Sequence, residues 1–332
     1  MWRNYLTVGI RALTKNKTYA FINIFGLAIG LAACLLILLY VRYELSYDRA
    51  LPNAANSYQL QSHFIDRDTG EEDKIQMASY VAGVNLKKDF PQIERSVYFQ
   101  QSSPVLLRGG EALPTEKVLY SGGAFFDVLR FPLVKGDPKT ALAQPGSLVI
   151  TQEEAERLFP GTDPMGKTLT LVSRGITTDF RITGVAKNPP SNSHVDFNMI
   201  ARVDFNTYYA DTPDFLTSWG WQSGWYYFTL KPGSDPQAIR DSLPAWERRN
   251  IPIQQIGTER VFAGEDQDWK VVNVRDVHLG EAQRASMTPS NDRATIATFA
   301  VVALLILGMA CVNFTNLATA RASQRAREVA LR

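Results

Sequence analysis

Two long apolar runs interrupt a chain that is otherwise polar. Phe21 to Val41 holds 21 residues without a charge, and Ile296 to Ala318 is uncharged as well. At about 1.5 Å per residue, the first run forms a helix of roughly 31 Å, which matches a hydrocarbon core of about 30 Å. The pattern therefore predicts a membrane protein with two transmembrane helices, residues 21–41 and 295–318, and a large water-facing domain between them.

The segment between the spans, residues 42–294, has the short mixed pattern of a folded domain. Its strand and helix patterns do not alternate regularly, so we expect an α+β fold, and its length predicts two lobes. Expected strands are Ser57–Phe64, Val97–Gln101, Val105–Arg108, Lys117–Tyr120, Leu148–Ile150, Thr168–Val172, Phe180–Val185, Val195–Ile200, Trp225–Lys231 and Lys270–Val274. Expected helices are Ala78–Asp89, Gly123–Leu129, Gln152–Phe159 behind a capping box at Thr151, and Asp235–Arg249, and Asp66–Lys74 is expected to be a charged turn.

The distribution of charge predicts the orientation in the membrane. Residues 1–20 carry a net +4 and residues 319–332 a net +3, so the chain's net +2 leaves −5 for residues 42–294. Basic flanks of membrane spans stay on the cytoplasmic side. Both termini are therefore expected in the cytoplasm and the acidic domain outside, which agrees with an even number of spans.

The basic N-terminus, residues 1–20, is expected to form a cytoplasmic or interfacial amphipathic helix. Its apolar residues recur at spacings of three and four, which indicates a helix lying in the inner headgroup layer. A plain cytoplasmic extension is the alternative. A cleavable signal peptide fits less well, because its apolar core is normally about 7–15 residues long. The apolar stripe consists of Trp2, Tyr5, Leu6, Ile10 and Leu13.

Small and polar residues within the spans indicate helix packing. Gly26 and Gly30 form a GxxxG pattern in the first span, which lets another helix approach closely. Asn313 and Asn316, near the end of the second span, can hydrogen-bond a neighbouring helix. Because only two spans are present, we expect the packing partners outside this chain or in a part of the protein beyond its end. The only cysteines, Cys34 and Cys311, lie in the spans, so the domain between them has no disulfide.

The stretch Gly161–Thr168 matches the phosphate-binding pattern GxxxxGK[ST], but we reject it as a nucleotide site. The pattern requires a strand before the loop and a helix after it, whereas here a helix precedes and a strand follows. Pro164 lacks an N–H group that would hold phosphate, and Asp163 would repel it. We interpret the stretch as a turn and expect no cofactor.

No arrangement of residues typical of catalysis or of metal binding is found. The three histidines, His63, His194 and His278, are far apart and match no metal motif. We interpret Ser193-His194, in a proline-rich turn, as a capped loop rather than a catalytic pair. The acidic domain has no basic stripe, which argues against nucleic-acid binding.

Several stretches resemble the FtsX/MacB-type permease family of ABC transporters. Asn313–Arg332 has the pattern N-x-x-N-L-A-x-A-R-x-x-x-R-x-x-E that ends the second span in this family. Gly123–Gly136, Phe159–Leu169 and Gly184–Phe197 resemble the MacB-like periplasmic core domain. The resemblance covers nearly the whole chain.

The resemblance implies a non-catalytic permease subunit in a bacterial inner membrane, with its large domain in the periplasm. A separate cytosolic ABC ATPase would hydrolyse ATP and drive the periplasmic domain to export or extract a substrate (mechanotransmission). A second permease unit, identical or paralogous, and a periplasmic adaptor or substrate protein are further implied partners. Because the family has more spans, we expect a longer protein. The implied ATPase contact comprises Arg321, Arg325, Arg327 and Glu328.

Two other functions remain as alternatives. A transmembrane sensor with a periplasmic sensing domain also runs span, outer domain, span and cytoplasmic helix, but it usually continues in sustained heptads. The tail after Ala318 has only a weak apolar seam. A membrane-anchored external enzyme would need a catalytic constellation.

Overall fold

The computed structural model describes residues 17–256 and 259–330, which form two compact units. One unit contains two long helices, which we call the helix pair. The other, Ser46–Asp292, contains all the strands and is called the large domain.

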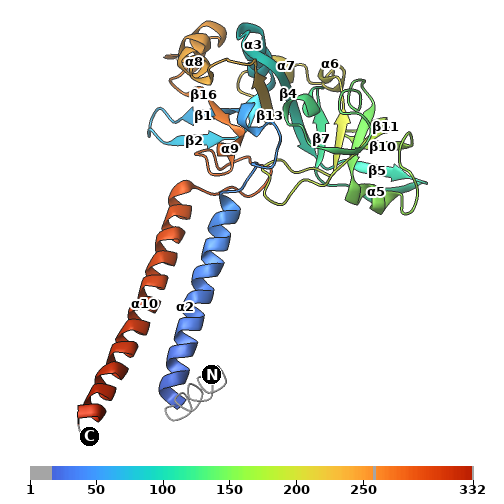
Figure 1. Ribbon diagram of the computed structural model, residues 1–332. Coiled ribbons are helices and arrows are strands. Elements are labelled where there is room, and N and C mark those ends of the chain that lie inside the picture. Colours follow the sequence, from blue (N-terminus) through green and yellow to red (C-terminus); the bar gives the residue numbers. More distant parts are fainter. Residues whose placement is uncertain (1–16, 257–258, 331–332) are drawn as a thin grey trace. The chain divides into compact units, whose positions relative to one another are not determined.

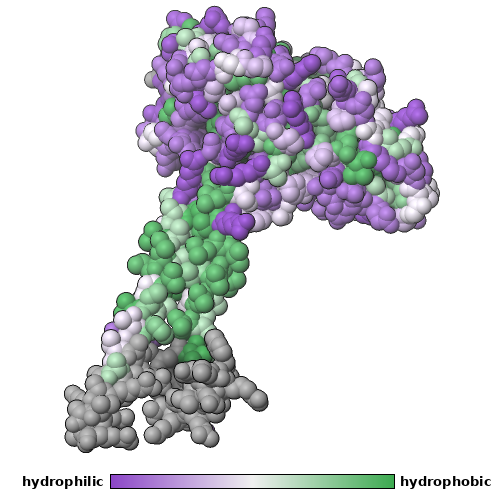
Figure 2. Space-filling model, in the orientation of Figure 1, coloured by the Kyte–Doolittle hydropathy of each residue, from purple (hydrophilic) through white to green (hydrophobic). Residues whose placement is uncertain are grey.

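The helix pair consists of α2 (Lys17–Glu44) and α10 (Arg293–Ala330), which pack against each other. The Tyr40 ring meets the Phe299 ring edge-on, with 5.6 Å between their centroids. Within these helices, Ile24–Glu44 and Arg293–Asn316 are long and apolar enough to cross a membrane. Figure 2 shows apolar side chains covering much of both helices, a surface that water solvates poorly.

Both helices run past the limits expected for the spans. Residues 1–16, which carry most of the predicted amphipathic helix, lie outside the described residues. Residues 17–20 belong to α2, so the first span continues without a break from Lys17. In the same way, α10 passes from residues 295–318 into residues 319–330 as one helix.

The large domain is built on a sheet of fourteen strands (Figure 1). Its main path runs β16-β1-β13-β4-β7-β12-β9-β11-β10-β5-β6, while β2, β3 and β8 pair at its sides. Neighbouring strands are antiparallel except for β9 with β11 and β7 with β12. The strands are β1 (Ser57–Ile65), β2 (Glu72–Ile75), β3 (Ala78–Ser79), β4 (Ile93–Ser102), β5 (Val105–Arg108), β6 (Glu111–Pro114), β7 (Val118–Ser121), β8 (Leu133–Lys135), β9 (Ser147–Thr151), β10 (Thr168–Ser173), β11 (Ile176–Ala186), β12 (Met199–Arg202), β13 (Gln222–Leu230) and β16 (Gln267–Asn273).

Helices and loops cover both faces of this sheet, and a separate hairpin stands outside it. The hairpin strands are β14 (Gln254–Ile256) and β15 (Glu259–Val261). The helices are the 3₁₀ turn η1 (Ala54–Asn56), α3 (Tyr80–Asp89), α4 (Phe125–Val128), α5 (Gln152–Leu158), α6 (Phe205–Tyr208), α7 (Asp214–Thr217), α8 (Pro236–Asn250) and α9 (Val274–Val277).

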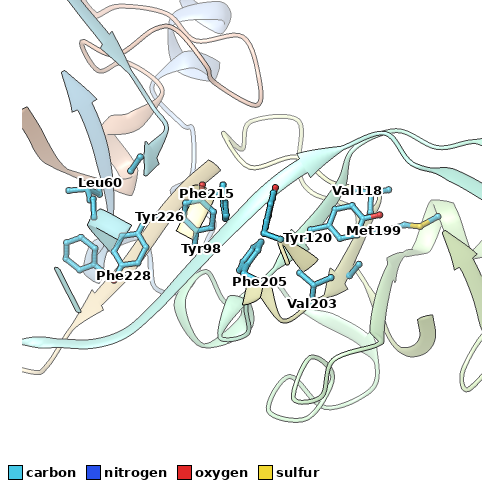
Figure 3. Close-up of a cluster of buried hydrophobic side chains, with 14 of the residues drawn as sticks. Leu60, Tyr98, Val118, Tyr120, Met199, Val203, Phe205, Phe215, Tyr226 and Phe228 are labelled. Carbon is cyan, nitrogen blue, oxygen red and sulfur yellow. The ribbon is translucent and has the colours of Figure 1, made fainter. Parts of the chain in front are cut away.

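The central strands are apolar on both faces because the sheet separates two hydrophobic clusters. Side chains alternate between the faces of a strand. Along β13, Tyr226 and Phe228 accordingly enter one cluster, and Trp225 and Tyr227 enter the other. Figure 3 shows part of the first cluster, where Tyr98, Phe205 and Tyr226 lie close together. The large domain is thus one compact unit built on one sheet, and not the two lobes predicted from chain length.

Some predicted elements differ from the observed ones, and in each case contacts with another segment of the chain explain the difference. The predicted helix Ala78–Asp89 begins at Tyr80, because Ala78 and Ser79 pair with β13 as β3. The strand expected at Val195–Ile200 begins only at Met199. Residues 195–198 form an irregular segment whose Asn198 N–H donates to the Lys117 carbonyl. The expected turn Asp66–Lys74 ends in β2, which pairs with β1.

Glu247 on α8 makes the stability of the large domain sensitive to pH. Its carboxylate is buried and accepts a hydrogen bond from the Trp269 backbone N–H at 2.9 Å. Burial raises the pKa of Glu247 to about 7. The folded state therefore holds this proton between about pH 4.5 and 7 while the unfolded state releases it, so stability falls as pH rises through that window.

We expect Glu247→Gln to raise stability at pH 8 by about 2–3 kcal/mol and to change little at pH 4. A glutamine carbonyl still accepts from Trp269 but carries no charge to bury. Unfolding of the full chain in detergent, followed by tryptophan fluorescence from pH 4 to 8, measures the effect. Glu153→Gln, on the exposed side of α5, is the control and should change neither end of the range. An equal gain at pH 4 and pH 8 would assign the effect to packing.

Candidate functional site at the connectors to the helix pair

The two predicted glycines of α2 face α10. A Cβ atom on Gly30 would lie 3.4 Å from the Ala310 Cβ, and one on Gly26 would lie 3.9 Å from the Asn313 Nδ2. Asn316 is exposed. The small-residue ridge thus contacts the other helix of this chain, whereas the sequence alone led us to expect its partner elsewhere.

The predicted ATPase-contact residues lie on the final turns of α10. Arg321, Arg325, Arg327 and Glu328 are part of the same continuous helix as the second span. Because a helix has 3.6 residues per turn, positions 321, 325 and 328 share one side and position 327 lies on another.

A buried polar cluster lies where the chain enters the large domain from α2. Asp48 comes four residues after the end of α2, and its N–H donates to the Asn192 carbonyl at 2.9 Å. Its Oδ1 accepts from the Ser193 hydroxyl at 3.1 Å and from the His194 N–H at 3.0 Å. Asp48 has a φ of +57°, a conformation that aspartate tolerates better than most residues. We call Ser46–Asp48, Asn192–His194 and Tyr227 the connector anchor.

The His194 ring links this turn to the centre of the sheet. Its Nδ1 lies 2.8 Å from the Asp48 Oδ2, and its Nε2 lies 2.9 Å from the Tyr227 hydroxyl on β13. Tyr227 in turn accepts from the Gln59 amide at 2.7 Å, so its own proton can go to Nε2. Asp48 and His194 are each 2% exposed and Tyr227 is 0% exposed. The first connector is therefore fixed to two central strands through a fully buried chain of polar groups.

The connector that leads to α10 meets the same turn. His278, just after α9, stacks its ring on Tyr47 with 3.3 Å between the centroids and 2° between the planes. Further along, the Thr288 hydroxyl donates to the Ser193 carbonyl at 3.3 Å. The Trp225 indole N–H donates to the Ala285 carbonyl at 3.0 Å. Both connectors are thus tied to the turn at Ser193, and to each other through Tyr47 and His278.

This cluster contains serine, histidine and aspartate, but its geometry does not create a nucleophile. The Ser193 hydroxyl donates to Asp48, whereas the Nε2 of His194 faces Tyr227. A nucleophilic triad instead needs the serine against the imidazole that takes its proton. Burial also raises the pKa of Tyr227 well above its usual value, which keeps the phenol protonated. The arrangement holds segments together and has no access for a substrate.

The loop that matches the phosphate-binding pattern uses its polar groups internally. It follows α5 and precedes β10. The N–H groups of Gly166 and Lys167 donate to the carbonyls of Ile182 and Pro164. The Lys167 ammonium lies 3.0 Å from the Thr162 hydroxyl, and Asp163 pairs with Lys135 at 3.0 Å. These contacts occupy the N–H donors and the lysine that would otherwise bind phosphate.

Sequence reasoning singled out His194 only as part of a capped turn and missed Asp48, Tyr227 and His278 as a set. Asp48 and His194 are 146 residues apart, so no local pattern links them. The one available signal was a polar Asn-Ser-His triplet beside two prolines. Among residues 17–256 and 259–330, no three His, Cys, Asp or Glu side chains form a group that could hold a metal ion.

Comparison with known families identifies the domain type. The sequence model of the MacB-like periplasmic core domain family matches residues 20–246. This stretch includes most of α2 and most of the large domain, together with every residue of the connector anchor.

Solved structures are similar to this chain at low sequence identity, and one of them has a TM-score that indicates a shared fold. A domain of a putative permease protein from Porphyromonas gingivalis is 18% identical with a TM-score of 0.53, over 68% of this chain and 92% of that one. The periplasmic region of MacB from Actinobacillus actinomycetemcomitans is 14% identical with a TM-score of 0.43, over 67% and 90%. The extracellular domain of the noncanonic ABC-type transporter YknZ from Gram-positive bacteria is 15% identical with a TM-score of 0.41, over 65% and 100%. No curated protein sequence matches significantly.

Proposed function

This chain belongs to the MacB-like periplasmic core domain family, and we propose that it works as a permease subunit of an ABC transporter. Residues 21–41 and 295–318 cross the inner membrane of a bacterium, and the large domain lies in the periplasm. The basic ends and the acidic middle of the chain support this orientation. The chain itself hydrolyses no ATP, and a separate cytosolic ATPase supplies the energy.

The proposed work is mechanical. Closure of the ATPase dimer moves the cytosolic end of α10, and the helix pair carries this motion toward the periplasm. A motion of the connectors can drive the large domain only if they are firmly held by it. The observation that supports this step is the connector anchor, where both connectors are tied to the turn at Ser193. The driven domain then exports or extracts a substrate, with a second permease unit and a periplasmic adaptor or substrate protein as further partners.

Co-purification from the native host tests the proposal. The full-length protein, tagged and extracted in detergent, is expected to bring an ABC ATPase with it. Combined Arg321→Ala, Arg325→Ala and Arg327→Ala substitutions should reduce the recovered ATPase at least tenfold, because they remove the cations of the proposed contact. Arg293→Ala, at the other end of α10, is the matched control and should leave recovery unchanged. Recovery of a histidine kinase or a methyl-accepting module without any ATPase would favour a transmembrane sensor instead.

A further inference from the structure

A cleft of about 250 Å³ opens on the large domain, on the side of the sheet opposite Tyr227. It lies between α3 and the turn that joins β12 to α6. We call it the Arg202 cleft. Aromatic side chains form part of its wall, where Tyr80 meets Tyr98 edge-on at 5.3 Å and Phe205 at 5.4 Å. Tyr226 completes the ring cluster, and Figure 3 shows Tyr98, Tyr226 and Phe205 side by side.

The cleft contains a guanidinium whose hydrogen-bond donors are only partly satisfied. Arg202 is half-buried, and its Nε has no hydrogen-bond acceptor among the described residues, while its Nη1 donates to the Val203 carbonyl. Burial lowers the pKa of Arg202, and the nearby Asp204 carboxylate offsets this effect only in part. Lys87, which also lines the cleft, donates to the Glu94 carbonyl at 2.8 Å and adds a second positive charge.

Among the described residues that line the cleft, the one carboxylate is that of Asp204, and its Oδ1 accepts hydrogen bonds at the start of α6. Asp204 caps α6, and its Oδ1 accepts from the Asn206 N–H at 3.0 Å and from the Asn206 amide at 3.1 Å. Asp204 acts on Arg202 through its charge, but the Arg202 Nε has no hydrogen-bond acceptor among the described residues. A half-buried guanidinium whose Nε lacks an acceptor costs free energy, and an incoming carboxylate would satisfy it with charge-assisted hydrogen bonds.

We propose that the Arg202 cleft binds a small amphipathic carboxylate. Its apolar ring or chain would pack against the tyrosine and phenylalanine side chains of the cleft, and its carboxylate would bind Arg202. A concave site with mostly apolar walls and a few convergent polar groups is the usual form of a small-molecule site. A guanidinium is also the side chain best shaped to hold a carboxylate. This proposal does not depend on the proposed function as a permease subunit driven by an ATPase.

The test uses the full chain in lipid nanodiscs and 2-naphthoate as the probe, with calorimetric titration against empty nanodiscs as the blank. The neutral 2-naphthamide has the same ring system but no charge. We expect 2-naphthoate to bind, Arg202→Gln to weaken its binding ten- to a hundredfold, and 2-naphthamide to bind the unaltered protein at least tenfold more weakly than 2-naphthoate. Arg95→Gln, on the exposed surface of β4, is the matched control and should not change the affinity.

A second variant keeps the proposal testable if Arg202→Gln does not fold. Val84 lines the cleft from α3 and is 48% exposed, so Val84→Phe narrows the cleft without disturbing the core. It should weaken 2-naphthoate at least tenfold. The proposal is overturned if 2-naphthoate does not bind at millimolar concentration. It is also overturned if 2-naphthamide binds as tightly, or if Arg202→Gln and Val84→Phe bind 2-naphthoate like the unaltered protein.

Discussion

Replacing Asp48 by alanine is expected to lower the stability of the large domain by about 3–5 kcal/mol, because it leaves three buried donors, the Ser193 hydroxyl and the N–H and Nδ1 of His194, without their acceptor. His194, 2% exposed, would keep its ring in the same site without the carboxylate that lies 2.8 Å from its Nδ1. The Ser193 hydroxyl would also lose its acceptor. Denaturant unfolding of the full chain in detergent, followed by tryptophan fluorescence, measures the loss.

Asp137→Ala is the matched control for this substitution. Asp137 also accepts a backbone N–H, from Lys139 at 3.0 Å, but it lies on the surface. Losing an exposed bond of this kind should cost about 1 kcal/mol or less. Hydrogen exchange provides a second measurement. Asp48→Ala is expected to speed amide exchange in the turn Asn192–His194 before it speeds exchange in the sheet. A loss no larger than that of Asp137→Ala would contradict the role we give the anchor.

The sequence predicted the two long apolar helices and most of the central strands because their signals are local. An uncharged run such as Phe21–Val41 needs no knowledge of the fold to be recognised. The strand β10 was also expected nearly at its observed limits, whereas β11 begins at Ile176, four residues before the expected start at Phe180. Elements with little apolar character, such as β6 and the hairpin of β14 and β15, were not predicted, since pairing with a neighbouring strand, not composition, creates them.

The functional geometry could not be predicted because it depends on contacts between distant segments. His194 was visible in the sequence, but its meaning depends on Asp48 and Tyr227, which the sheet brings together. The same holds for Arg202, whose Nε is seen to lack an acceptor among the described residues only once the fold places it in the cleft and Asp204 caps α6. The pattern of apolar residues predicts which side chains are buried. Recognising a binding site also requires knowing which polar groups lack a hydrogen-bond partner, and this depends on the folded structure.

Replacing Gly224 on β13 by alanine should be strongly destabilising. At this glycine, β13 packs closely against β4. A Cβ atom at this position would lie 2.6 Å from the Phe99 carbonyl oxygen and 2.6 Å from the Tyr98 hydroxyl. Contacts this short force the backbone or the ring to move, and interiors packed like crystals have little room for such shifts. We expect a loss of about 3 kcal/mol or more.

Gly220→Ala, four residues earlier, separates this steric effect from a general effect of losing glycine. No atom lies within 4 Å of a Cβ at Gly220, which is exposed, so this variant should unfold within about 0.5 kcal/mol of the unaltered protein. Thermal unfolding of both variants, as full chains in detergent, gives the comparison. Because the Tyr98 ring that a Cβ on Gly224 would displace also walls the Arg202 cleft, Gly224→Ala should weaken 2-naphthoate binding in whatever fraction stays folded. Equal midpoints for the two variants would mean that β13 and β4 can separate without cost, and the close packing inferred at this position would be wrong.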